Sequence, residues 1–165
     1  MTIVFRQLHA GDREEYLTLM LAAYKPIYAL GIPFDAATAT LEKVTQHIAE
    51  HGVYAVFSEG VMRASVTIRY PWGPIPGPFG VPHFGWFGAH PNYKDRRWGR
   101  EIQEWVEQNI LIDKLKAPAV SLGTAVTHPW LKQMYERRGF ESIHEVDIGT
   151  GHNIVFMKKI LEKSS

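Results

Sequence analysis

The stretch HPNYKDRRWGREI, residues 90–102, places a proline, four cations and one glycine just before an amphipathic segment. It predicts a turn that opens a helix, because Trp98, Ile102 and Ile110 recur on one helical face. A helix N-terminus offers free backbone N–H groups and the positive end of the helix dipole. Cations at that end are unfavourable unless an anion binds there, so the stretch favours a phosphate site. A solvated basic surface is the more frequent origin of such a turn and stays open from this stretch alone.

On the N-terminal side of this turn the chain reads as strands and helices. Residues 3–8 fit a short strand, and Asp12 with Glu15 resembles a capping box that starts a helix. Pro26 is expected to kink or end that helix, and Asp35 is expected to cap a second helix ending at Gly52. Residues 53–70 predict a hairpin that turns at Glu59-Gly60. Its second strand alternates apolar residues with a polar face made by Arg63, Ser65, Thr67 and Arg69.

Residues 71–82 form a loop rich in proline and glycine, followed by an aromatic strand at 83–89. Gly85 and Gly88 in that strand indicate a bulge, or close approach of a ligand or another backbone. Beyond the helix that follows the turn, a strand at 119–126, a short helix stopped by Gly139, and strands near 140–147 and 153–159 are expected. The order β-α-α-β-β-β-α-β-α-β-β predicts a single α/β (α+β) domain over residues 1–165. Its sheet should be mixed, mostly antiparallel and six- to seven-stranded, with about four flanking helices.

Composition excludes several classes of protein. The chain of 165 residues is 45% apolar and carries a formal net charge of +1, of which the turn at 94–100 supplies +3. The remainder is therefore acidic, and no nucleic-acid partner is expected. The absence of cysteine excludes disulfides, thiolate zinc sites and a cysteine nucleophile. Without an 18-residue apolar run or a signal-peptide pattern, the expected protein is cytoplasmic and has no membrane partner.

Two motifs resemble those of the GNAT superfamily of acetyl-CoA-dependent N-acetyltransferases. In the family's pyrophosphate motif, Arg/Gln-x-x-Gly-x-Gly/Ala, Lys94 stands at the Arg/Gln position, Arg97 at the first glycine and Gly99 at the second. The second signature, a tyrosine followed by Glu, a basic residue, any residue and Gly-Phe, reads YERRGF from Tyr135 to Phe140. The order of elements is similar over nearly the whole chain. Arg97 is the larger departure, because its side chain must point out of the loop, toward the adenosine 3′-phosphate or into solvent.

The resemblance implies transfer of an acetyl group from acetyl-CoA, a co-substrate, to a primary amine of a small molecule by direct attack in a ternary complex. It also implies that residues 87–89 pair with the pantetheine arm. A non-catalytic acyl-CoA-binding or sensor protein of the same fold is the alternative. The coenzyme-binding residues expected on this basis are Phe87, Gly88, Ala89, Lys94, Asp95, Arg96, Arg97, Trp98, Gly99, Arg100, His128 and Tyr135.

Three side chains are candidates for the chemistry. Tyr135 matches the family's tyrosine near the coenzyme sulfur and would protonate the leaving thiolate, or else merely pack on the core. His83 would take the amine's proton near neutral pH, or else be a satisfied strand residue. His128 would bind the coenzyme, act as a base, or cap the helix at Pro129. The eight histidines include no pair with helix-face spacing and a carboxylate partner, so no metal site is expected.

The acceptor pocket is expected between the first two helices and the loops at the end of the sheet. An aromatic wall there suits a hydrophobic or aromatic amine, or a cation held over ring faces. The alternative is that most of these rings belong to the core. A homodimer is compatible with the aromatic strand edges. The expected acceptor-binding residues are Tyr24, Tyr28, Phe34, Trp72, Phe84 and Trp86.

Overall fold

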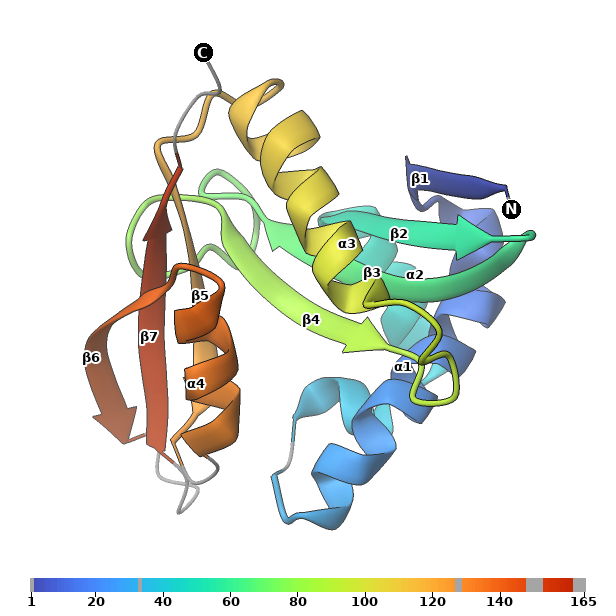
Figure 1. Ribbon diagram of the computed structural model, residues 1–165, viewed down its shortest axis with the longest axis horizontal. Coiled ribbons are helices and arrows are strands. Elements are labelled where there is room, and N and C mark those ends of the chain that lie inside the picture. Colours follow the sequence, from blue (N-terminus) through green and yellow to red (C-terminus); the bar gives the residue numbers. More distant parts are fainter. Residues whose placement is uncertain (1, 33, 127–128, 148–152, 162–165) are drawn as a thin grey trace.

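A computed structural model describes residues 2–32, 34–126, 129–147 and 153–161. Seven strands form one sheet in the order β1-β2-β3-β4-β5-β7-β6 (Figure 1). All neighbours are antiparallel except β4 and β5, which are parallel. The mixed, mostly antiparallel sheet is therefore confirmed. The strands are β1 (Ile3–Gln7), β2 (Gly52–Ser58), β3 (Val61–Arg69), β4 (His83–Ala89), β5 (Ala119–Ala125), β6 (Glu141–Asp147) and β7 (Asn153–Ile160).

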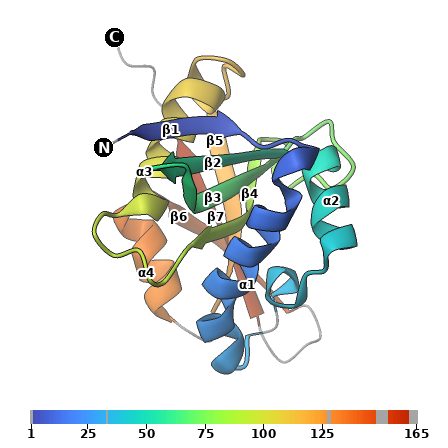
Figure 2. The same cartoon turned by 90° about the vertical axis from the view of Figure 1, so that its right-hand side faces the viewer.

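The helices cover both faces of the sheet, as Figure 2 shows for α1 and α2 on one side and α3 on the other. Alternate residues of β2 divide between two cores: Val53 and Ala55 pack toward α1 and α2, and Tyr54 and Val56 pack toward α3. The predicted order of elements is confirmed. The helices are α1 (Arg13–Ala29), α2 (Leu41–Glu50), α3 (Trp98–Val106), continued by a π-helical segment (Glu107–Ile112), and α4 (Pro129–Arg137); two short 3₁₀ turns are Ala10–Asp12 and Asp35–Thr38.

Two predicted helix caps are wrong, and of the two alternatives for Pro26, a kink or the end of the helix, the end is excluded. The Asp12 carboxylate pairs with Arg6 at 2.9 Å and accepts the backbone N–H of His9, so it makes no side-chain cap for α1. Asp35 opens a 3₁₀ turn instead of capping α2, whose cap is the Thr40 hydroxyl. Helix α1 does not end at Pro26 but runs to Ala29, since the hydrogen bond that proline forfeits lies in the last two turns.

The polar face predicted for the second hairpin strand is buried as well. Ser65 and Thr67 are fully buried, because α1 and α2 pack across this face. Thr67 forms a hydrogen bond with His47 Nε2 at 2.8 Å and lies 3.4 Å from the Tyr16 hydroxyl. Polar groups that leave water in this way need such partners. The alternation of apolar and polar residues therefore identified the two faces of β3 but did not show that both are buried.

Strand β4 bulges in its middle and then separates from β5. Thr67 pairs with Gly85 and Ser65 with Gly88, so two residues of β4 stand opposite one residue of β3. Within this bulge Trp86 has a φ of 30°, in the left-handed region. Pairing of β4 with β5 is limited to residues 83–84 and 121–122, after which the strands diverge (Figure 1). The bulge that the glycines indicated is confirmed, and the strand edge beyond it faces the gap.

Candidate functional site

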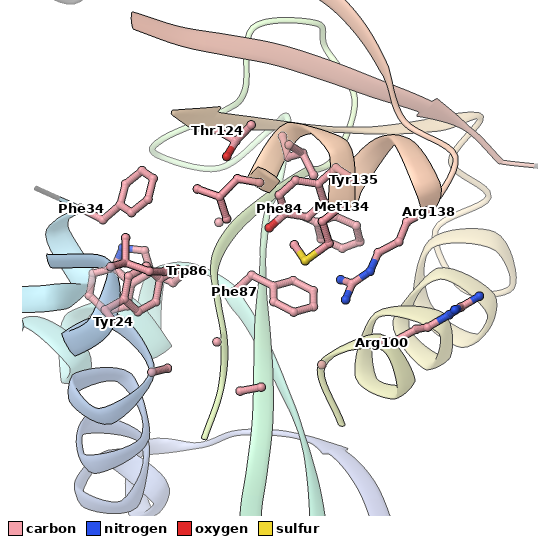
Figure 3. Close-up of a pocket in the computed structure, with 18 of the residues that line it drawn as sticks. Tyr24, Phe34, Phe84, Trp86, Phe87, Arg100, Thr124, Met134, Tyr135 and Arg138 are labelled. Atoms are coloured by element: carbon pink, nitrogen blue, oxygen red, sulfur yellow. The ribbon is translucent and has the colours of Figure 1, made fainter. Parts of the chain in front are cut away.

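A cavity of about 1240 Å³ occupies the gap between β4 and β5 and extends to the turn before α3. Its walls come from α1, the end of β3, β4, the start of α3, β5, α4 and β7. Figure 3 shows Met134 and Tyr135 reaching from α4 toward β4, with Tyr24 and Trp86 on the α1 side. Pockets for one small molecule usually measure about 300–1,000 Å³, so this one has room for two ligands side by side.

Most of the predicted site residues line this cavity. The coenzyme candidates that do so are Phe87, Gly88, Ala89, Lys94, Arg96, Arg97, Trp98, Gly99, Arg100 and Tyr135; the acceptor candidates are Tyr24, Phe34, Phe84 and Trp86, and the candidate base His83 lines it as well.

The other predicted site residues lie elsewhere. Asp95 is not in the cavity wall, because its carboxylate accepts a hydrogen bond from Trp98 Nε1 at 3.1 Å. Tyr28 is 54% exposed and Trp72 is 70% exposed, and both lie outside the cavity. Trp72 instead stacks on Tyr70, with ring centroids 5.0 Å apart. The cavity therefore gives these two acceptor assignments no support. His128 falls outside the described residues.

The N-terminus of α3 forms one end of the cavity. Arg97 is the N-cap residue and makes no side-chain cap bond, since a guanidinium only donates hydrogen bonds. The first backbone N–H groups of α3 therefore remain for a ligand. A Cβ on Gly99 would lie 3.1 Å from the Phe87 ring, so this glycine lets α3 begin close to β4.

Two of the four cations of the turn are offset by acids of α3 itself. Arg96 pairs with Glu101, and Arg100 pairs with Glu104 at 2.9 Å. Within the described part of the chain, Lys94 and Arg97 make no ion pair with a carboxylate. These two side chains are therefore the ones most available to a phosphate group.

Three further cations, which the sequence did not predict, also line the cavity. Arg137 and Arg138 of α4 lie within the YERRGF motif, which could have indicated them, whereas Arg69 has no comparable signal. Arg138 donates to Gln103 Oε1 at 2.8 Å and lies 5.5 Å from the Phe87 ring centroid. Seven lining residues are Lys or Arg and one, Asp35, is acidic, so the cavity suits anionic ligands.

Tyr135 stands in the middle of the cavity wall, on α4. Burial raises the pKa of its phenol, an effect that the charge of Arg138 partly offsets. The phenol therefore keeps its proton at neutral pH. In the described residues its hydroxyl has no hydrogen-bond partner, so the proton is available to a ligand.

His83 lies at the start of β4 and is almost fully buried. Its Nδ1 shares a hydrogen bond of 2.7 Å with the Ser121 hydroxyl of β5. Burial, helped by the charge of Arg69, lowers the pKa of His83 to about 3. This environment does not favour titration near neutral pH, and a catalytic role for the imidazole stays a prediction.

Two further features are absent from the described residues. No group of three or more His, Cys, Asp or Glu side chains in the described ranges could hold a metal ion. Nor is any described helix both long and apolar enough to cross a membrane.

Comparisons with known proteins give relatives of nearly the same length. No protein-family model matches the chain. It is 48% identical over 150 residues to the S-(2-succino)cysteine N-acetyltransferase of Bacillus subtilis (strain 168), covering 91% of each chain. It is 36% identical over 163 residues to the S-alkylcysteine N-acetyltransferase of the same organism, covering 96% of this chain and 89% of that relative.

Solved structures show the same fold at low sequence identity. The PaiA N-acetyltransferase of Thermoplasma acidophilum, solved in complex with coenzyme A, matches with a TM-score of 0.74 and 17% identity over 97% of this chain and 99% of that one. The ribosomal-protein-S18-alanine N-acetyltransferase of Escherichia coli matches with a TM-score of 0.70 and 12% identity, covering 99% and 97% of the two chains.

Proposed function

Because the chain belongs to the GNAT superfamily and is an N-acetyltransferase, we propose that it acetylates the α-amino group of an S-substituted cysteine. The observation that supports this most strongly is 48% identity to an enzyme named for S-(2-succino)cysteine. Both curated relatives are named as enzymes acting on cysteine thioethers, which argues against the non-catalytic alternative. The substituents in the two names differ, so the shared substrate is the amino-acid part with its thioether.

The acceptor end of the cavity fits such a molecule. Tyr24, Phe34 and Trp86 present ring surfaces there. A thioether sulfur and the carbon atoms bonded to it make favourable contacts with aromatic rings. The rings therefore suit the side chain of the acceptor and leave its amine and carboxylate to polar groups.

Acetyl-CoA is proposed to enter from the other end. Backbone N–H groups of α3 and the side chains of Lys94 and Arg97 hold the pyrophosphate, and residues 87–89 pair with the pantetheine arm. The thioester then lies in the gap beside the β4 bulge, facing Tyr135 and the acceptor.

Transfer proceeds by direct attack in a ternary complex. The neutral amine forms a bond from its nitrogen to the carbonyl carbon, and the bond from that carbon to sulfur breaks. Tyr135 donates its hydroxyl proton toward the departing thiolate, and the proton that the amine nitrogen loses passes through water to restore the Tyr135 hydroxyl. Products are the N-acetylated amino acid and free coenzyme A.

We also propose that residues 1–165 act as one GNAT domain in the cytoplasm, without a metal ion, membrane or nucleic-acid partner. The grouping of cations inside the cavity, in a chain of net charge +1, supports small anionic ligands over a nucleic acid. A homodimer stays a prediction, to be tested by sedimentation.

The test is release of free thiol from acetyl-CoA with a panel of amines. S-methylcysteine, S-benzylcysteine and S-(2-succino)cysteine are compared with spermidine and with a peptide that begins with alanine. We expect at least one cysteine thioether to exceed spermidine and the peptide by about 100-fold in kcat/KM, roughly 2.7 kcal/mol of discrimination. A preference for spermidine or for the peptide contradicts the proposed substrate.

Coenzyme binding should depend on salt and on two particular cations. Replacing both Lys94 and Arg97 by Gln should weaken acetyl-CoA binding by about 10-fold and flatten its salt dependence, because two charge-assisted contacts are lost. Calorimetry at low and high sodium chloride measures both effects. Arg96→Gln is the matched control, since Glu101 already engages Arg96 and a smaller loss is expected. Unchanged affinity in the double variant contradicts the assignment of the phosphate end.

The rise of rate with pH should follow the acceptor and not His83. The His83 pKa of about 3 keeps its imidazole neutral throughout the range from pH 6 to 9. Two acceptors whose amines differ in pKa by about one unit should therefore give pH profiles displaced by about one unit. The His83→Gln protein should show the same displacement. If the rise of rate with pH is the same for both acceptors and disappears in His83→Gln, His83 is the base.

A further inference from the structure

Arg69 lines the cavity, and the proposed reaction assigns no role to its positive charge. It is the last residue of β3 and pairs in register with His83 at the start of β4. Its side chain crosses the face of Gly85, where an added Cβ would come within 3.2 Å of Arg69 Cδ. The glycine therefore makes room for the arginine to lie along the cavity wall.

The guanidinium is half-buried and lacks an acidic partner. Its Nε donates to the Ile75 carbonyl at 2.8 Å and its Nη2 to the Pro76 carbonyl at 3.4 Å. Over the ranges that the structure describes, no carboxylate lies within ion-pair distance of it, and Nη1 has no hydrogen-bond partner. A cation taken partly out of water in this way is costly unless an anion binds it.

The titratable groups whose pKa the charge of Arg69 shifts are three histidines, which cannot supply that anion. Burial lowers the pKa of His47, His51 and His83, and the positive charge of Arg69 lowers each of them further. The three rings are thus neutral at neutral pH and leave the charge of Arg69 uncompensated. Two loop carbonyls fix the guanidinium in position, which suits the paired hydrogen bonds that a carboxylate accepts.

Arg69 is also remote from the phosphate end. Its register partner His83 lies six positions before Ala89, which leads into the turn before α3. At about 3.3 Å per residue this is about 20 Å of strand, too far for the pyrophosphate to serve as its partner. The anion that fits Arg69 therefore belongs to the acceptor.

We propose that Arg69 binds a carboxylate of the acceptor and thereby selects amino acids over simple amines. The inference rests on the proposed function and adds to it the residue that recognises the acid group. Two sources of that group are possible in a cysteine thioether, the α-carboxylate and an acid on the sulfur substituent. Three acceptors separate them: S-methylcysteine has the first, S-(carboxymethyl)cysteamine has the second, and S-methylcysteamine has neither.

Arg69→Gln should raise KM for the acceptor with the recognised carboxylate by about 10- to 100-fold, in the range of one lost charge-assisted pair. The KM for S-methylcysteamine and the KM for acetyl-CoA should stay within about twofold of the wild-type values. Arg63→Gln is the matched control on the same strand. Arg63 lies over the Tyr93 ring and outside the cavity wall, so its loss should affect all three acceptors alike.

Equal loss of activity toward all three acceptors in Arg69→Gln would overturn the proposal and reduce Arg69 to an anchor for the loop at 75–76. Unchanged kinetics with every acceptor would overturn it as well. Thermal unfolding of each variant checks that the fold is retained.

A binding measurement separates this inference from the proposed function. Calorimetry compares an acid with its uncharged amide: 3-(methylthio)propanoate where the kinetics assign the α-carboxylate, and (ethylthio)acetate where they assign the acid on the sulfur substituent. None of these compounds can be acetylated at an amine. The wild type should bind the acid about 10-fold more tightly, and Arg69→Gln should lose that preference. If the acid is preferred but no cysteine thioether is acetylated, the proposed substrate is wrong and the role of Arg69 stands. If the wild type does not prefer the acid, the role of Arg69 is wrong whatever the enzyme acetylates.

Discussion

Turnover is expected to fall by about 100-fold or more when Tyr135 is replaced by Phe, while the affinity for acetyl-CoA changes little. The substitution removes one hydroxyl and keeps the ring, whose edge-to-face contact with Phe140 has centroids 5.9 Å apart. Loss of packing should therefore be small. What disappears is the proton that the cavity offers to the leaving sulfur.

The environment of the phenol explains why the effect should be large. Burial raises its pKa above the ordinary value of about 10, whereas a thiol ionises near 8.5. The phenol is thus protonated whenever the enzyme works, and it stabilises the thiolate by donating a hydrogen bond as the carbon–sulfur bond breaks. This help arises mainly in the transition state, so kcat should fall and KM should not.

Tyr28→Phe is the matched control for this prediction. It removes the same hydroxyl from a residue that is 54% exposed and outside the cavity. Steady-state kinetics on both variants should show a change of less than about twofold for Tyr28→Phe. An unchanged turnover number in Tyr135→Phe would leave Tyr135 as a packing residue.

The parts of the site that the sequence predicted are those tied to a local signal. The turn at 94–100 is recognised by its charge and by Gly99. Tyr135 is recognised by its place before Gly139 and Phe140. Periodicity and turn residues predicted the order of the seven strands and the four α-helices, most of which bury an apolar face; β6 is the exception, since nearly all of it is exposed. Such signals lie within a few residues of one another, so no tertiary information is needed to read them.

The parts that were missed depend on contacts between distant segments. Nothing near Arg69 in the sequence says that its strand face is covered by two helices, or that residues 75 and 76 return to hold its guanidinium. Likewise Tyr28 and Trp72 are aromatic, but only the folded chain shows that they are exposed and lie outside the cavity wall. The local sequence predicts that Asp12 caps α1. It does not show that the carboxylate pairs with Arg6, because Arg6 lies on another element, β1.

Mild acid should destabilise the fold strongly between pH 6.5 and pH 5. Burial lowers the pKa of His47 and of His83 to about 3, and both imidazoles are neutral in the folded protein. In the unfolded chain each has a pKa near 6.5, so over this interval the unfolded state binds more protons. The contribution of the two neutral imidazoles to the free energy of unfolding is therefore complete above about pH 6.5. It is lost progressively as the pH falls toward their pKa in the folded protein. Each group loses about 1.4 kcal/mol per pH unit, which gives about 4 kcal/mol for the two at pH 5.

Urea unfolding at pH 7.5 and pH 5.0 measures this loss. The interval lies above the range in which ordinary carboxylates titrate, so the lowered pKa of Asp12 contributes little to it.

The double variant His47→Gln, His83→Gln is the control for the acid effect. A glutamine amide can keep a hydrogen bond to the hydroxyls of Thr67 and Ser121, which the two imidazoles contact at 2.8 and 2.7 Å, but it takes up no proton in this range. Its stability should therefore change much less than that of the wild type between the two pH values, and the remaining loss is assigned to His51, whose pKa burial also lowers. Each single variant should lose less than the wild type and more than the double variant. A wild type equally stable at pH 7.5 and pH 5.0 contradicts the prediction, because it would require both rings to accept protons where they lie. The same result would return His83 to consideration as a base that titrates near neutral pH, since stability and catalysis then depend on one and the same protonation.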